Sequence, residues 1–144
     1  MASTVVESVL VRRPFEEVAK VATDACAVLP LVGGRVALMR EYADGSAEWD
    51  LFLDIGTIHV GGRIVVRPTD GTTLSWQSIR GTSQSAVLEV TSEGEHSRVT
   101  VTTTTEFTGL VFAALTERLA RGIVGRHVRA GLEQLRHQLE HGES

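Results

Sequence analysis

The sequence has few cysteines, no net positive charge and no long apolar run, and each of these absences excludes a class of protein. Cys26 is the only cysteine among 144 residues, which excludes an internal disulfide and favours a reducing, cytoplasmic location. The net charge of −4 gives no general attraction to nucleic acid or anionic membranes. No apolar run approaches the roughly 20 residues of a transmembrane helix, and the N-terminal residues show no signal-peptide pattern. We therefore expect a cytoplasmic protein with neither a nucleic-acid partner nor an integral membrane segment.

The residues that are present suit one globular domain spanning 1–144. Apolar residues make up 42% of the chain and charged residues 22%, which are ordinary values for a globular protein. A chain of this length buries about two-thirds of the surface that it exposes when unfolded. No internal repeat, low-complexity tract or linker divides it.

The first third of the chain predicts one strand followed by two short helices. β-branched residues over 4–12 are typical of a strand, and Pro14 is well placed to open a helix over 15–22. Asp24 is expected to cap a second short helix over 25–29, which a proline and two glycines then terminate. The two short helices are expected to close one end of the sheet. From residue 35 the apolar period changes to two, which predicts six further strands: 35–42, 47–57, 59–67, 72–80, 84–92 and 97–107.

Short glycine-containing turns connect these strands, so neighbouring strands must pair antiparallel. After Gly109 the apolar period returns to 3.6, which predicts one helix of roughly 30 residues. Its apolar stripe is expected to comprise Leu115, Leu119, Ile123, Val128, Leu132, Leu135 and Leu139. One strongly curved antiparallel sheet that wraps around this helix buries both the stripe and one sheet face, so we predict an α+β fold.

Strand alternation predicts which residues face the helix. Trp49, Leu51 and Leu53 share one face of their strand, as do Leu74 and Trp76 farther along the chain. Simple alternation places four polar residues on the same inner face, toward one end of their strands: Ser78, Arg80, Thr103 and Thr105. A space between sheet and helix lined in this way is a natural pocket.

Several segments resemble one known superfamily. They are the step from strand to helix over 11–18 (VRRPFEEV), the glycine-rich turn over 56–63 (GTIHVGGR), the Leu74-Ser75-Trp76 strand, and 98–101 leading toward the last helix. With them the chain resembles the START-like, Bet v 1-like helix-grip superfamily (SRPBCC), specifically its bacterial polyketide cyclase/dehydrase and lipid transport branch. The resemblance implies a curved sheet of six to seven strands around a long C-terminal helix. The superfamily includes lipid carriers and aromatase/cyclases, so the resemblance does not indicate one particular activity.

The sequence carries no strong catalytic, metal or cofactor signature. Of five histidines only His137 and His141 have helical spacing, and they favour a solvated helix end over a zinc site. Cys26 lies in an apolar helix and is interpreted as a buried structural thiol. Glu7 faces inward if Val5 does, and an inward carboxylate would need a partner, either Arg80 or a threonine hydroxyl. In the alternative register, Glu7 faces water.

Binding of a hydrophobic small molecule, such as a lipid, polyketide or aromatic metabolite, is the leading function hypothesis. Trp49 and Trp76 are either core residues or part of the cavity wall. The expected ligand-binding residues are Trp49, Leu51, Leu53, Ile64, Trp76, Ser78, Arg80, Val101, Thr103, Leu115 and Leu119. One alternative is a cyclase/dehydratase in which Arg80 polarises a carbonyl and Glu7 or a water molecule transfers protons. Another is a partner-binding accessory protein, monomeric or homodimeric.

Overall fold

A computed structural model describes residues 2–55, 58–106 and 117–142. In these ranges it has seven strands and three helices. The strands are β1 (Ala2–Val11), β2 (Arg35–Glu41), β3 (Ala47–Ile55), β4 (Ile58–Val66), β5 (Thr73–Gly81), β6 (Ser83–Glu93) and β7 (His96–Glu106), and the helices are α1 (Phe15–Ala22), α2 (Ala25–Val32) and α3 (Glu117–His141).

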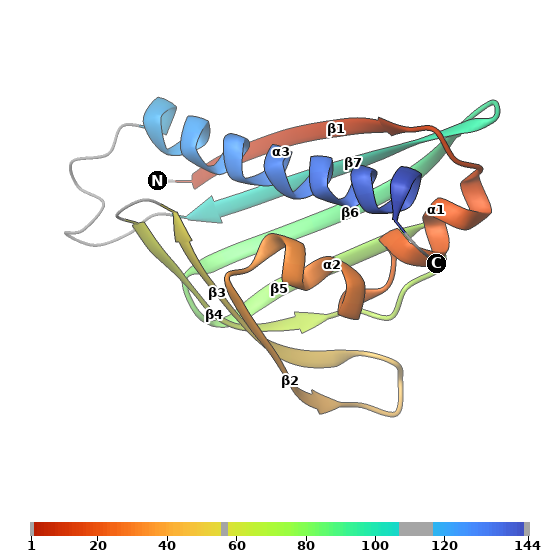
Figure 1. The fold of residues 1–144 in the computed structure, drawn as a ribbon. Helices are drawn as coiled ribbons and strands as arrows, with labels where there is room; N and C mark the ends of the chain where they lie inside the picture. Colours follow the sequence, from red (N-terminus) through yellow and green to blue (C-terminus); the bar gives the residue numbers. More distant parts are fainter. Residues whose placement is uncertain (1, 56–57, 107–116, 143–144) are drawn as a thin grey trace.

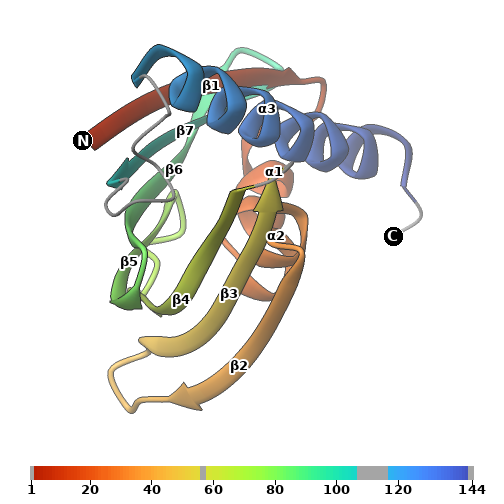
Figure 2. The same ribbon diagram turned by 90° about the vertical axis from the view of Figure 1, so that its left-hand side faces the viewer.

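The strands form one antiparallel sheet in the order β1-β7-β6-β5-β4-β3-β2. The meander and the α+β fold are thus confirmed. Figure 1 shows α3 running along β1 and β7, with α1 at one end of the sheet and α2 in front of the sheet between α3 and β2. In the turned view of Figure 2 the sheet bends strongly, so that β2, β3 and β4 curl away from α3 while β1 stays beside it. The concave face therefore looks toward the helices.

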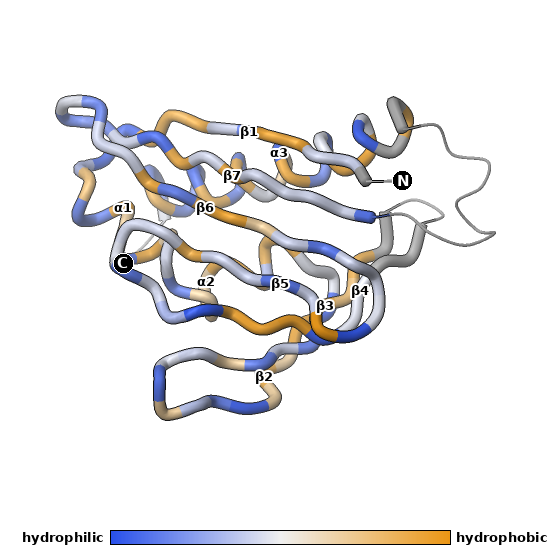
Figure 3. The backbone as a smooth tube through the Cα atoms, turned by 180° about the vertical axis from the view of Figure 1, so that it is seen from behind, coloured by the Kyte–Doolittle hydropathy of each residue, from blue (hydrophilic) through white to orange (hydrophobic). Residues whose placement is uncertain are grey.

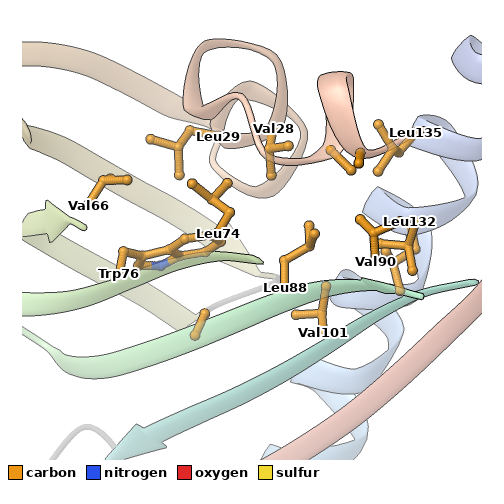
Figure 4. Packing of buried hydrophobic residues seen from close by; sticks show 14 of the residues in the cluster. Val28, Leu29, Val66, Leu74, Trp76, Leu88, Val90, Val101, Leu132 and Leu135 are labelled. Carbon is orange, nitrogen blue, oxygen red and sulfur yellow. The ribbon is translucent and has the colours of Figure 1, made fainter. Parts of the chain in front are cut away.

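One face of the sheet supplies most of the core. Along β6 the inner positions, Gln84 to Val90 at every second residue, are buried, and the residues between them are exposed. Seen from behind in Figure 3, apolar and polar stretches both occur along the strands of the sheet. Figure 4 shows the inner side chains of Leu74, Trp76 and Leu88 packed toward Val28 of α2 and Leu132 of α3.

A β-bulge overturns the prediction that Arg80 faces inward. Ser78 pairs with Ile64 and Arg80 pairs with Arg63, so Ile79 is an extra residue that shifts the alternation by one. Partners across a ladder share a face, and the Arg63 Nε donates to Asp50 Oδ1 at 2.9 Å on the outer face. Arg80 is therefore exposed on the outside of the sheet, and the prediction based on unbroken alternation is wrong.

Two glycines in β4 allow the strands to approach closely at this bulge. A Cβ on Gly61 would collide with the backbone of Leu51 and Phe52, and a Cβ on Gly62 would collide with the Arg80 carbonyl. Both residues also have positive φ angles, +148° and +154°. The sequence of this pair is compatible with a tight hairpin or a bulge, and its position within β4, beside the register shift, supports the bulge.

The second helix differs from its prediction in two respects. α2 continues through Pro30 to Val32, and the Gly33 N–H then donates to the Leu29 carbonyl. Pro30 cannot donate a hydrogen bond to the Cys26 carbonyl, and its ring crowds that carbonyl. The helix nevertheless continues past Pro30 and ends at Gly33, where the backbone becomes extended. Cys26 was expected to be buried but is exposed, because it and Pro30, one turn later, lie on the helix face away from buried Val28 and Leu29.

Candidate functional site

A small cavity of about 40 Å³ lies where the sheet, α2 and α3 meet. The sheet contributes the floor, and the two helices contribute the walls. Its lining residues are Val28, Leu31, Val32, Trp76, Leu88, Val101, Thr103, His127, Val128, Gly131, Leu132 and Leu135. Apart from Thr103 and His127, these residues have apolar side chains or none, so the cavity favours an apolar occupant.

The floor comes from neighbouring strands in one register. Leu88 of β6 lies opposite Val101 of β7, and Ala86 lies between Trp76 on β5 and Thr103 on β7. All four strand residues that line the cavity therefore belong to two adjacent rows of the inner face. Trp76 is only 4% exposed, so its ring is both part of the core and part of the cavity floor.

The walls meet where α3 packs closely on the end of α2. A Cβ built on Gly131 would lie 3.1 Å from the Leu31 carbonyl oxygen, so only glycine allows this approach without a shift. One turn earlier, the His127 ring contacts the Val32 carbonyl oxygen, with 2.5 Å between Nε2 and O. These two contacts join α2 to α3 along one side of the cavity.

His127 is the only ionisable residue that lines the cavity among the described residues. A carbonyl oxygen can only accept a hydrogen bond, so the contact with Val32 places a proton on Nε2. In the neutral ring, Nδ1 is then a hydrogen-bond acceptor. The Thr103 hydroxyl, on the floor, can both donate and accept. The cavity thus combines an apolar surface with two polar side chains that can orient a ligand.

Three of the predicted ligand-binding residues line this cavity: Trp76, Val101 and Thr103. Four others, Trp49, Leu51, Leu53 and Ile64, lie buried in the core away from it. Ser78 is half-buried on β5, and its hydroxyl oxygen accepts a hydrogen bond from the Gln84 N–H at 2.9 Å. Leu115 lies outside the described residues.

Leu119 does not belong to the buried stripe of α3. It is 50% exposed, whereas Val124, Leu132 and Leu135 are buried. The predicted stripe joined Ile123 to Val128, a step of five residues, which an α-helix cannot keep on one face. The buried stripe runs instead through Val124 and Val128. Leu119, five residues before Val124, is rotated by about 140° from it, and its prediction as a cavity residue is wrong.

Glu7 faces inward, as one of the two registers predicted. Val5 and Val9 beside it on β1 are buried, whereas Val6 is 60% exposed. The partner of the carboxylate is Arg129 of α3, whose Nη2 donates to Oε1 at 3.0 Å and whose Nε donates to Oε2 at 3.2 Å. The register with Val6 inside is therefore wrong.

The partner expected for Glu7 was Arg80 or a threonine hydroxyl, but the carboxylate pairs with Arg129 because α3 lies over β1. Together they lie in an open groove between β1 and α3, separate from the apolar cavity. A Cβ at Gly125 would lie 3.5 Å from Glu7 Oε1, which is an ordinary van der Waals contact. This ion pair stabilises the packing of α3 on the edge strand.

Sequence reasoning missed the residues that the helices contribute. Leu132 and Leu135 had been assigned to the apolar stripe of the last helix but not to the site. The α2 residues were missed because α2 was expected only to close one end of the sheet. His127 had a usable signal: it lies three residues after Val124 and four before Gly131, both buried, so it shares their face of α3.

Two further classes of site find no support in the described ranges. No group of three or more histidine, cysteine, aspartate or glutamate side chains there has the geometry of a metal site. His137 and His141 lie near each other on α3, with ring centroids 5.3 Å apart, but no third ligand joins them there. None of the helices described is long and apolar enough to cross a membrane.

No protein-family model matches the chain, and no curated protein is significantly similar to it in sequence. Several solved structures, in contrast, are similar along nearly their whole length. A protein of Thermus thermophilus superimposes with a TM-score of 0.83 at 18% identity, over 98% of this chain and 99% of that one.

Two others carry descriptive names. The Zhui aromatase/cyclase of a Streptomyces species has a TM-score of 0.74 at 18% identity, over 97% of this chain and 94% of its own. A START superfamily protein of Mycobacterium smegmatis has a TM-score of 0.70 at 20% identity, over 94% and 98%. The chain therefore has the helix-grip fold of the START-like, Bet v 1-like superfamily. At such identities the likeness concerns the fold, so the function must be argued from the site.

Proposed function

We propose that this protein binds a hydrophobic small molecule, such as a lipid, a polyketide or another aromatic metabolite, between its sheet and its helices. The observation that supports this most is the cavity itself, whose lining, as far as the described residues show, is apolar except for Thr103 and His127. Ligand sites commonly combine a mainly apolar wall with a few polar groups that fix orientation. The similarity in fold to an aromatase/cyclase and a START superfamily protein agrees with this class of ligand.

The cavity must widen to accept such a ligand. Its volume is about 40 Å³, whereas sites for drug-sized molecules measure roughly 300–1,000 Å³. The floor is part of a continuous hydrogen-bonded sheet, so the helices are the walls that can move. Separation of α3 from α2 would break the hydrogen bond between His127 and Val32 and relieve the close approach at Gly131. Only the molecules with an open cavity can bind, so the apparent affinity equals the affinity of the open form multiplied by the fraction of molecules that are open.

Fluorescence titration with N-phenyl-1-naphthylamine, a neutral apolar probe, tests this proposal. The wild type should bind it saturably at one site. Val101→Phe, which adds bulk to the cavity floor, should weaken binding at least about tenfold, as expected when the probe no longer fits. Val87→Phe is the matched control, because Val87 lies on the outer face of the neighbouring strand and is 44% exposed. It should leave binding unchanged.

Urea unfolding of both variants shows whether each remains folded under the titration conditions. The proposal fails if the folded wild type gives no saturable response. It also fails if folded Val101→Phe binds the probe as tightly as the wild type does. Equal weakening by Val101→Phe and Val87→Phe would point to a surface effect and would likewise contradict a cavity site.

The cyclase/dehydratase alternative loses the residues on which it relied. Arg80 lies on the outer face of the sheet, and the Glu7 carboxylate is held by Arg129 outside the cavity. The alternative of a partner-binding protein rested on the exposed surface of the last helix, and no described contact favours it further. Binding of a small molecule is therefore the function that the geometry supports best.

A further inference from the structure

Four polar side chains form a row across the inner face of the sheet, one from each of four adjacent strands. We call Ser3, Thr105, Gln84 and Ser78 the polar row. Thr105 of β7 pairs with Ser3 of β1 on one side and with Gln84 of β6 on the other. Ser78 of β5 completes the row, because its hydroxyl accepts from the Gln84 N–H at 2.9 Å.

The polar row is buried, and part of its hydrogen-bonding capacity is unused. Ser3 is 1% exposed, Thr105 6% and Gln84 9%. Among the described residues, Ser3 Oγ and Gln84 Nε2 are fully buried and have no hydrogen-bond partner. Most buried polar groups in proteins are paired, because an unpaired one loses its hydration without compensation. Two such atoms in one row indicate a place where an external group supplies the missing partner.

The polar row borders the apolar cavity. On β5, Ser78 lies two residues beyond Trp76, and on β7, Thr105 lies two residues beyond Thr103; both Trp76 and Thr103 line the cavity. Two residues along a strand span about 7 Å, and their side chains point to the same face. A ligand whose apolar body lies over Trp76 and Thr103 can therefore bring one of its ends to the polar row.

We propose that the polar row is the subsite for a neutral hydrogen-bonding end, a carbonyl or phenolic hydroxyl, of the ligand whose body occupies the cavity. This inference rests on the function proposed above and specifies the ligand further. The row offers an amide donor at Gln84 and hydroxyls at Ser3 and Thr105, and none of its members is charged. A carboxylate or ammonium group buried there would lack a countercharge and incur a large desolvation cost. A neutral oxygen that accepts from Gln84 Nε2 does not.

Two probes of similar size separate this subsite from the cavity: 1-naphthol, which carries a hydroxyl, and 1-methylnaphthalene, which does not. The wild type should bind 1-naphthol more tightly, by about fivefold, as one additional net hydrogen bond gives. Gln84→Leu should abolish that preference while binding of 1-methylnaphthalene stays within about twofold of the wild type. Ser3→Ala should reduce the preference and serves as the second variant if Gln84→Leu does not fold. Gln77→Leu, on the exposed outer face of β5, is the matched control and should keep it.

Unfolding of the unliganded variants by urea gives an independent readout. Removing an unpaired buried polar group should leave the midpoint of Gln84→Leu equal to or above that of the wild type. A clearly lower midpoint would show that the amide has a structural partner and would overturn the inference. The inference would also be overturned if the wild type bound the two probes with equal affinity. The same holds if the preference for 1-naphthol survived in both Gln84→Leu and Ser3→Ala. Binding of 1-methylnaphthalene in those cases would leave the proposed function standing, whereas the failure of both probes would overturn both.

Discussion

Replacement of the glycines in α3 by alanine tests the packing that forms the cavity wall. Alanine in a helix interior is more favourable than glycine by about 1 kcal/mol. The space for a new methyl group differs at the three positions. At Gly122 the nearest atom would be Arg126 Nη1 at 4.0 Å, at Gly125 it would be Glu7 Oε1 at 3.5 Å, and at Gly131 it would be the Leu31 carbonyl oxygen at 3.1 Å.

These distances predict three different changes in the free energy of unfolding. Gly122→Ala should stabilise the protein by about 1 kcal/mol, because only the intrinsic helix propensity of the residue changes. Gly125→Ala should have a similar or slightly smaller effect, since 3.5 Å is an ordinary van der Waals contact. Gly131→Ala must push a backbone carbonyl away, and overpacking costs about 1–3 kcal/mol. The net effect there should range from about zero to a loss of about 2 kcal/mol.

Equilibrium unfolding in urea, followed by the emission of the two buried tryptophans, measures all three variants under identical conditions. The difference between Gly122→Ala and Gly131→Ala is the informative quantity, because both changes share the same propensity gain. We expect this difference to be about 1–3 kcal/mol. If Gly131→Ala stabilises the protein as much as Gly122→Ala does, α3 does not pack on the end of α2 as described.

Three further predictions concern other parts of the chain. His127→Ala should lower the free energy of unfolding by about 1–2 kcal/mol, because the hydrogen bond to Val32 is lost. The same variant should bind N-phenyl-1-naphthylamine more tightly, because α2 and α3 then separate more easily. An unchanged affinity would argue against widening of the cavity between these two helices. The Arg12 N–H donates to Glu140 at 2.8 Å and lowers the pKa of that carboxyl below its ordinary value of 4.5. Glu140 therefore contributes stability above pH 4.5 that is lost as the pH falls through its lower folded pKa. Glu140→Gln should flatten the acid side of the stability–pH curve, and an unchanged slope would contradict the contact. Exposed Cys26 should react with Ellman's reagent in the native protein within a few-fold of its rate in urea, whereas strong protection would show burial.

Most of the fold could be predicted from local sequence patterns. Inside/outside alternation and short turns specified each strand to within a few residues and specified the antiparallel meander, because period and turn chemistry are local properties. The bulge at Ile79 is a different case. It depends on how closely Gly61 and Gly62 of β4 approach β5, which is a tertiary property, and it reversed the facing of Arg80.

The site was less predictable than the fold, because it depends on how helices lie across the sheet. The inward facing of Trp76, Val101 and Thr103 follows from the alternation of side chains along a strand alone. The role of α2 and the pairing of Glu7 with Arg129 follow from the path of α3, which no local pattern specifies. The exposure of Leu119 shows why the spacing within a predicted stripe must be checked at every step. The predicted stripe joined Ile123 to Val128 across five residues, which an α-helix cannot hold on one face.

The most direct test of a ligand site between sheet and helices is a methyl NMR titration with N-phenyl-1-naphthylamine. The account predicts saturable shifts in the methyl signals of Leu88, Val101 and Leu132, which line the cavity from three different elements. The exposed outer-face methyl groups of Ile79 and Val87 serve as internal controls and should remain unchanged. Shifts confined to Ile79 and Val87, with the cavity signals unmoved at saturating probe, would contradict the account.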